Sequence, residues 1–329
     1  MSTVTSTSQP ATSSPLRRLI SDHPLVAYFV IAFAGTWLFV LPLLLSKNGV
    51  GLLPFTFSEI GLILVGALPT LCGPTLGALT VTAAISGKAG VGRFLRRYLQ
   101  WRVGVPWYLL ALFSFLLVYL LSVSIPLGAG PLLALIRQWS LLFSLFLPLM
   151  GLQILFVALW EEPGWRGFAL PRLQQRYGPV LGTIVLGTLH SFWHLPTGFI
   201  MGGPLYPFAL TTFLTFVLTG IAASFIYTWI YNHAKGSILI AILIHAAANA
   251  ASGVVNQLLP ANPHLSLLAS ALYYDNWSNV IAFGAVALLL IVFTRGRLGY
   301  KPDQNTQLVE TPRPAETPAT GAGEQADRS

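Results

Sequence analysis

Long apolar runs separated by short polar segments dominate the chain between about residues 21 and 298. A helix needs about 20 apolar residues to cross the hydrocarbon core of a bilayer, and these runs reach or approach that length. The pattern therefore predicts an all-α integral membrane domain with about eight transmembrane helices. The predicted spans are 24–46, 59–86, 106–126, 139–162, 179–199, 208–231, 236–258 and 278–295.

The two ends of the chain differ from this pattern. Residues 1–20 begin with a Ser/Thr/Pro/Ala-rich stretch, and residues 299–329 are rich in Pro, Thr, Ala, Glu and Gln. Polar segments of this kind bury too little apolar surface to fold alone. We therefore expect a disordered cytoplasmic N-terminus at 1–20, one multi-span membrane domain at 21–298, and a disordered cytoplasmic tail at 299–329.

Composition excludes a soluble fold. Hydrophobic residues make up 54% of the chain and charged residues only 9%, whereas soluble domains carry about 25% charged residues. The net charge of +8 does not indicate a nucleic-acid partner, because the basic residues lie between apolar runs rather than in a patch with interleaved aromatics. The expected partner is the lipid bilayer. A single cysteine, Cys72, excludes an intrachain disulfide and a CxxC site.

The basic residues predict the orientation of the spans. With a cytoplasmic N-terminus, 16 of the 18 Lys and Arg residues fall on the cytoplasmic side, and only Lys47 and Arg137 fall outside. We therefore expect a multi-pass plasma-membrane protein with both termini in the cytoplasm. The segment 91–103 combines four arginines with aromatic and aliphatic residues, which is typical of an interfacial helix. A basic cytoplasmic loop is the alternative.

A few polar residues interrupt the predicted spans. Ionisable groups within a bilayer are costly, so each one is a candidate functional residue. Amide side chains next to them extend the same candidate site. The set comprises Glu161 and Glu162 at the end of the fourth span, His190 and His194 in the fifth, and His245 and Asn249 in the seventh.

Helical spacing orders these residues. His190 and His194 are four residues apart and share one face, and the same holds for His245 and Asn249. Glu162 lies four residues before Arg166, the favourable order for an ion pair, although Pro163 disfavours a helical conformation at Glu162. We expect one glutamate to pair with Arg166 and the other to remain free to act.

A free carboxylate that faces imidazoles and an amide is typical of a hydrolytic site. The carboxylate can take a proton from water as general base, while a histidine holds that water. A second histidine and the asparagine can donate hydrogen bonds to the oxyanion that forms when an amide carbonyl is attacked. The alternatives are a solvated helix end for the two glutamates, packed or interfacial histidines in the fifth span, and a helix-packing pair in the seventh.

Together the residues resemble the CPBP family of intramembrane proteases, which includes the CAAX prenyl endopeptidases and bacterial Abi and bacteriocin-processing proteins. The similarity covers roughly residues 100–255. The family motif EExxxR matches Glu161, Glu162 and Arg166; an aromatic residue followed four positions later by His matches at His194, with His190 in the aromatic position; and HxxxN matches His245 and Asn249.

The resemblance implies an endopeptidase that hydrolyses a peptide bond near the cytoplasmic membrane face with a glutamate-activated water and no metal. Its substrate would be a peptide or protein at the membrane, with a lipid-modified tail as one option. The alternative function is a non-catalytic scaffold or immunity protein of the same fold. The implied catalytic residues are Glu161, His194, His245 and Asn249, supported by Glu162 and Arg166.

A bound metal is the alternative to the glutamate-activated water. His190 and His194 have the four-residue spacing of two zinc ligands on a helix, and either Glu161 or His245 could complete the set.

The predicted depths of Glu161 and His194 disagree. Glu161 would lie near the cytoplasmic face, whereas His194 would lie roughly 22 Å into the fifth span at 1.5 Å per residue. For the two to meet, we expect Glu161 to lie deeper, with residues 163–177 folded back into the protein. A later start of the fifth span is the alternative.

Overall fold

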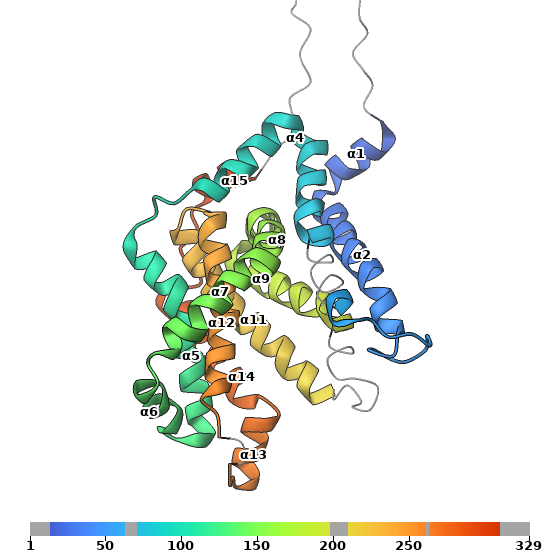
Figure 1. The fold of residues 1–329 in the computed structure, drawn as a ribbon. Coiled ribbons are helices and arrows are strands. Elements are labelled where there is room, and N and C mark those ends of the chain that lie inside the picture. Colours follow the sequence, from blue (N-terminus) through green and yellow to red (C-terminus); the bar gives the residue numbers. More distant parts are fainter. Residues whose placement is uncertain (1–13, 63–70, 198–209, 261–262, 310–329) are drawn as a thin grey trace, which may run out of the picture.

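The computed structural model describes residues 14–62, 71–197, 210–260 and 263–309, and this part of the chain contains helices and no strand (Figure 1). Five helical segments are long and apolar enough to cross a membrane, or six if one bent helix pair counts as a span. The chain is therefore a multi-pass integral membrane protein. The segments are α2 (Pro24–Leu45), α5 (Val105–Leu127), the stretch Leu142–Thr197, α11 (Leu210–His233), α12 (Ile238–Gln257), and α13 (Leu267–Tyr274) with α14 (Trp277–Phe293) at 71°.

The expected count of eight spans stays a prediction. Residues 63–70 of the second predicted span lie outside the described residues, as do the edges 198–199 and 208–209 of the fifth and sixth. The predicted spans 24–46, 106–126, 236–258 and 278–295 coincide with helices to within a few residues. The predicted spans 139–162 and 179–199 instead belong to one helical stretch, Leu142–Thr197. Hydropathy locates these helices because the bilayer requires their backbone groups to be bonded within the segment.

Helix α12 lies in the middle of the bundle and packs against α5 and α7 (Leu147–Gln153) (Figure 1). Most of its residues are buried, including the alanines at 246–248 and 250–251. Small side chains let neighbouring helices approach closely where lipid supplies no hydrophobic drive for association. His245 and Asn249 are therefore held at the centre of the protein.

The stretch Leu142–Thr197 is a series of short helices rather than one rod. It contains α7, α8 (Leu159–Glu162) and α9 (Leu170–Trp193). One π-helical turn, Leu142–Phe146, precedes α7, and two more, Ile154–Ala158 and Pro163–Ala169, join the three helices. Such turns are frequent at functional sites because each one re-aims the side chains that follow it. The last of these turns begins directly after the glutamate pair.

The segment after the glutamates folds back into the protein, as we expected. Residues 163–174 are buried, and only 175–177 are exposed before the chain turns at Gly178. Gly178 has φ 78° and ψ 169°, a conformation that favours glycine, and Pro179 then restarts the helix. Glu161 therefore lies deep enough to meet the histidines of α9.

Helix α4 (Leu76–Arg96) bends at Gly87 and continues well beyond the predicted end of the second span. The segment 91–103 is thus helical up to Leu99, but one of its arginines does not face lipid headgroups. Arg97 is 8% exposed; it donates to the carbonyls of Gly167 and Gly236 and to the Tyr231 hydroxyl. Arg97 therefore links the folded-back segment, at Gly167, to the turn before α12, at Gly236.

The two ends of the chain are more ordered than their composition predicts. α1 (Pro15–Asp22), capped by Ser14, begins within the segment 1–20 expected to be disordered, and α15 (Pro302–Leu308) lies within the expected disordered tail. Asn305 of α15 is buried and donates to the Pro171 carbonyl at 2.9 Å. This hydrogen bond from the Asn305 side chain holds α15 against the rest of the protein, although the segment has no apolar face to bury. The rest of both ends, 1–13 and 310–329, lies outside the described residues.

α1 and α15 lie at the same end of the bundle, whereas α6 (Gly130–Arg137) lies at the opposite end (Figure 1). A chain that crosses the membrane an even number of times places its first and last helices at the same end of the bundle, as α1 and α15 are placed here (Figure 1).

Candidate active site

Both glutamates of the first motif are buried. Glu161 is 1% and Glu162 0% exposed, and they occupy the last turn of α8. Two contacts to the turn Leu71–Thr75 fix this part of the backbone. The Thr75 hydroxyl donates to the Trp160 carbonyl, and Pro74 packs so closely on Gly164 that a Cβ there would collide with it. The position of the glutamates is therefore set by packing on both sides of them.

Glu162 is the glutamate that pairs with Arg166. Arg166 Nη1 donates to Glu162 Oε1 at 2.7 Å, as the four-residue spacing predicts despite Pro163. The π-helical turn that starts at Pro163 keeps the chain helical, so the two side chains remain on one face. The Arg166 guanidinium also lies 4.0 Å from the centre of the Tyr227 ring. A buried ion pair of this kind needs such additional partners.

Glu162 Oε1, which accepts from Arg166, also accepts a hydrogen bond from the third motif. His245 Nδ1 donates to Glu162 Oε1 at 2.7 Å, so one oxygen joins α8 to α12. This bond leaves Nε2 of His245 as the ring nitrogen available to ligands. Asn249, one turn further along α12, donates through Nδ2 to Gln153 Oε1 at 2.8 Å. The orientation of both α12 side chains is thus fixed by residues that precede Pro163.

Glu161 faces the histidines of α9. His190 Nε2 donates to Glu161 Oε2 at 3.2 Å. The ring of His190 packs on Trp165 with centroids 4.9 Å apart and lies 5.2 Å from the ring of His194. The aromatic position of the second motif is therefore filled by a histidine that packs like an aromatic residue and also bonds the glutamate.

Glu161, His190 and His194 form a group that could hold a metal ion, since one donor atom from each lies within 4.8 Å of the others. Two imidazoles and one carboxylate are a known ligand set of catalytic zinc sites. His245, the other residue of the predicted ligand set, is not in this group; its Nδ1 is bonded to Glu162 and its Nε2 is left available. The donor chemistry fits a divalent metal.

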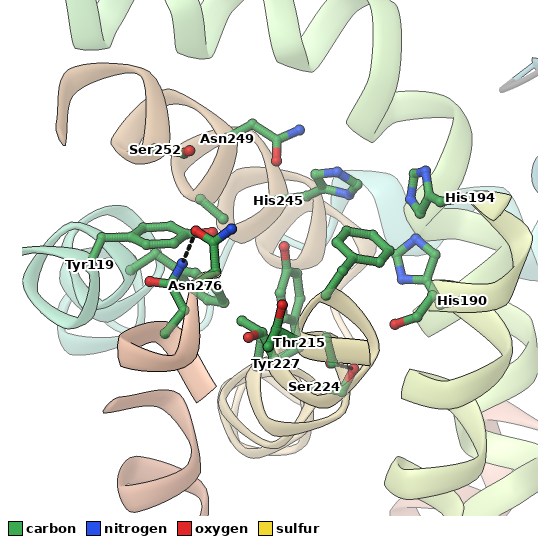
Figure 2. Close-up of a pocket in the computed structure, with 18 of the residues that line it drawn as sticks. Tyr119, His190, His194, Thr215, Ser224, Tyr227, His245, Asn249, Ser252 and Asn276 are labelled. Atoms are coloured by element: carbon green, nitrogen blue, oxygen red, sulfur yellow. Dashed lines mark hydrogen bonds between the residues drawn. The ribbon is translucent and has the colours of Figure 1, made fainter. Parts of the chain in front are cut away.

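A cavity of 390 Å³ opens beside these side chains. His190 of α9 and His194, which caps the C-terminal end of α9, line it, and so do His245 and Asn249 of α12 (Figure 2). Glu161 is not one of the lining residues; its carboxylate accepts a hydrogen bond from His190, which is. The structure therefore places five of the predicted site residues around one space: Arg166, His190, His194, His245 and Asn249. The two glutamates contact this set, Glu161 through His190 and Glu162 through His245 and Arg166.

Three residues that support the site were missed in the sequence. Trp165 and Tyr227 hold His190 and Arg166 through ring contacts, and an aromatic residue in an apolar run gives no signal of such a role. Gln153 did give a signal in the sequence, because it is a polar side chain inside the fourth predicted span, eight residues before Glu161.

The fold and the site define a class: a helical membrane protein with a buried glutamate, histidine and arginine cluster beside an internal cavity. Residues 138–251 match the family model described as "Type II CAAX prenyl endopeptidase Rce1-like". This segment contains all three motifs.

A curated relative, "CAAX prenyl protease 2" of Methanococcus maripaludis, is 34% identical over 107 residues, which are 32% of this chain and 39% of the relative. The match thus spans about two fifths of the length of that relative. Both comparisons support the resemblance to the CPBP intramembrane proteases, and the family model covers the segment that forms the site.

Proposed function

We propose that this chain is an intramembrane endopeptidase that hydrolyses a peptide bond close to the cytoplasmic face of the plasma membrane. The observation that carries the proposal is the arrangement around the cavity. Two imidazoles of the α9 segment, one of them bonded to the buried Glu161 carboxylate, line the same cavity as a histidine and an asparagine that are held by hydrogen bonds. This set offers a base and an oxyanion site in one space.

In the proposed mechanism a water molecule binds between Glu161 and His194. Glu161 removes a proton from it, and the water oxygen attacks the carbonyl carbon of the scissile bond. His245 and Asn249 stabilise the negative charge that develops on the carbonyl oxygen. The proton held by Glu161 then passes to the leaving nitrogen as the C–N bond breaks, which regenerates the carboxylate.

Three further residues have supporting roles. Glu162 supplies the negative charge next to His245, which must carry a proton on both ring nitrogens to donate to Glu162 and to the oxyanion at once. Arg166 balances the charge of Glu162. His190 holds the Glu161 carboxylate toward the cavity wall.

A metal-dependent version of the same hydrolysis is the second candidate, because the donor atoms of three side chains already lie close together. Glu161, His190 and His194 would hold the ion. A bound divalent metal supplies Lewis acidity and lowers the pKa of water. The two versions differ in their response to chelators.

The test is cleavage of a quenched peptide library, with a prenylated CAAX reporter included, by the purified protein in liposomes. We expect cleavage that Glu161→Gln and His194→Ala each abolish and that a chelator leaves unchanged. Loss of cleavage with chelator and recovery with zinc would establish the metal-dependent version. If no peptide is cleaved and both variants equal the wild type, the protein is a non-catalytic scaffold or immunity protein.

A further inference from the structure

A second pocket, of about 450 Å³, shares no lining residue with the cavity beside the histidines. Its walls come from the end of α4 with the 3₁₀ turn that follows, from the turn between α11 and α12, and from α15. α4 and α15 lie at the same end of the bundle (Figure 1). Because α11 and α12 are both long and apolar enough to span, the turn 234–237 between them lies at a membrane surface. The pocket is therefore at the level of the lipid headgroups.

The pocket has an excess of positive charge. Arg93, Arg97 and Lys235 line it, and no carboxylate is among its described lining residues. Asp303, the acidic residue of α15, is exposed and does not line the pocket. A concave site that is lined by one sign of charge concentrates ions of the opposite sign. The pocket therefore favours an anion.

The buried charge of Arg97 strengthens this preference. Within the described part of the chain its hydrogen bonds all go to neutral acceptors, which are the carbonyls of Gly167 and Gly236 and the Tyr231 hydroxyl. None of the ion pairs between described residues includes Arg97. A buried charge without a counter-charge is costly, so an anion in the same pocket would stabilise it.

Hydrogen bonds hold the walls of the pocket and leave the amino group of Lys235 available. Gln100 Nε2 donates to the Lys235 carbonyl at 3.1 Å, and the Ser237 hydroxyl donates to the Gln100 carbonyl at 2.7 Å. The Lys235 side chain is exposed, and its amino group has no hydrogen-bond or ion-pair partner among the residues that the structure describes. It can therefore reach a ligand without breaking a contact of the protein.

Exposed apolar side chains beside the pocket favour a lipid over a soluble anion. Leu95, Leu99 and Trp101 are exposed at the end of α4 and just beyond it. The Arg102 guanidinium lies 5.0 Å from the centre of the Trp101 ring. Tryptophan is enriched where a protein meets the membrane surface, and basic pockets between membrane helices bind anionic lipid headgroups. Apolar residues beside a basic pocket suit a ligand that has both acyl chains and a charged headgroup.

We infer that this pocket binds the phosphate of an anionic phospholipid headgroup. Lys235 and Arg93 contact the phosphate, and Arg97 contributes its charge from behind them while its N–H groups stay on the protein carbonyls. Arg97 also joins the pocket to Gly167, directly after Arg166 of the first motif. A bound lipid therefore stabilises the folded-back segment, and this effect does not depend on the proposed peptidase activity.

Binding of lipid to the full-length protein in a neutral detergent tests the inference. The probe is short-chain phosphatidylglycerol, compared with phosphatidylcholine of the same chain length and with inorganic phosphate. Thermal unfolding and native mass spectrometry measure the binding. We expect phosphatidylglycerol to raise the melting temperature and to stay bound, because a ligand of the folded state stabilises it. At the same concentration, phosphatidylcholine and inorganic phosphate should do neither.

Variants of the exposed basic residues locate the binding site. Lys235→Gln and Arg93→Gln should each weaken the binding of phosphatidylglycerol about fivefold, the contribution of one basic residue close to anionic lipid. Arg96→Gln is the matched control and should leave the binding nearly unchanged, because Arg96 is exposed on the same segment and does not line the pocket. Melting of each variant without lipid shows that it is folded.

The outcomes separate a lipid site from its alternatives. Equal binding of phosphatidylcholine and phosphatidylglycerol, or equal losses in the three variants, overturns the inference. Stabilisation by inorganic phosphate as strong as that by phosphatidylglycerol also overturns it, because the pocket then takes a soluble anion. Binding of phosphatidylglycerol that depends on Lys235 and Arg93 but not on Arg96 supports the inference, whether or not the protein cleaves peptides.

Discussion

The two adjacent glutamates have different surroundings, and this difference assigns them different roles. Glu161 contacts a histidine that lines the cavity, whereas Glu162 is enclosed between Arg166 and His245. Neighbouring residues on a helix point about 100° apart, so the separation follows from their adjacency. The roles can be told apart by measuring activity and stability on the same variants.

Glu161→Gln should lower kcat/KM by at least about 100-fold, because a general base contributes a factor of 10² to 10⁴. Its thermal stability should stay close to wild type, since glutamine can still accept a hydrogen bond from His190. Glu162→Gln should instead lower both activity and stability, because it leaves the buried charge of Arg166 unbalanced, a loss of about 3–5 kcal/mol. Equal effects of the two changes on melting temperature would contradict this assignment.

His190→Phe separates the two versions of the hydrolysis. Phenylalanine keeps the ring packing on Trp165 and removes the bond to Glu161. If the water is activated by Glu161 and His194 alone, we expect kcat/KM to fall by no more than about tenfold, the value of one hydrogen bond. The assay is run with and without chelator. A loss of activity as large as that of Glu161→Gln, together with loss of zinc binding, would show that His190 is a metal ligand.

At the scale of helices and turns, the site depends on the segment that folds back after Pro163. Arg97 holds it through bonds to backbone carbonyls on both sides of the site. Arg97→Ala should therefore lower the stability by about 3 kcal/mol or more, since bonds from a charged donor contribute about 1.5–3 kcal/mol each. Arg96→Ala, at an exposed neighbouring position, is the control, and thermal unfolding in detergent is the measurement. Equal melting of the two variants would show that Arg97 does not hold the segment.

The sequence predicts these elements unevenly. Apolar runs such as 106–126 and 236–258 predict helices with nearly correct ends, because hydropathy in a bilayer is a local property. Motif spacing predicts the pairing of Glu162 with Arg166 equally well, because a contact between residues four apart on a helix is also a local property. The docking of Asn305 on Pro171, by contrast, depends on residues 134 positions apart. The residues that line the cavity likewise come from several helices that are far apart in the sequence.

At the scale of the whole molecule, the orientation in the membrane follows from the distribution of basic residues and stays a prediction. The natural Cys72 is replaced by serine, and single cysteines are introduced at Lys47, Arg18 or Lys301. A membrane-impermeant maleimide added to intact cells should label position 47 and leave positions 18 and 301 unlabelled until the cells are opened. Labelling of 18 or 301 in intact cells would reverse the topology and move the proposed site to the outer face.

The single oxygen that Glu162 shares between Arg166 and His245 has a consequence for synthesis of the protein. Glu162 and Arg166 leave the ribosome about 80 residues before His245, as their positions in the chain require. During that interval the two charges are each other's partners within one helical turn, so the segment enters the lipid as a neutral pair rather than as two isolated charges. The ion pair thus lets Glu162 and Arg166 enter the lipid together, and the later arrival of α12 adds His245 to two charges that are already matched.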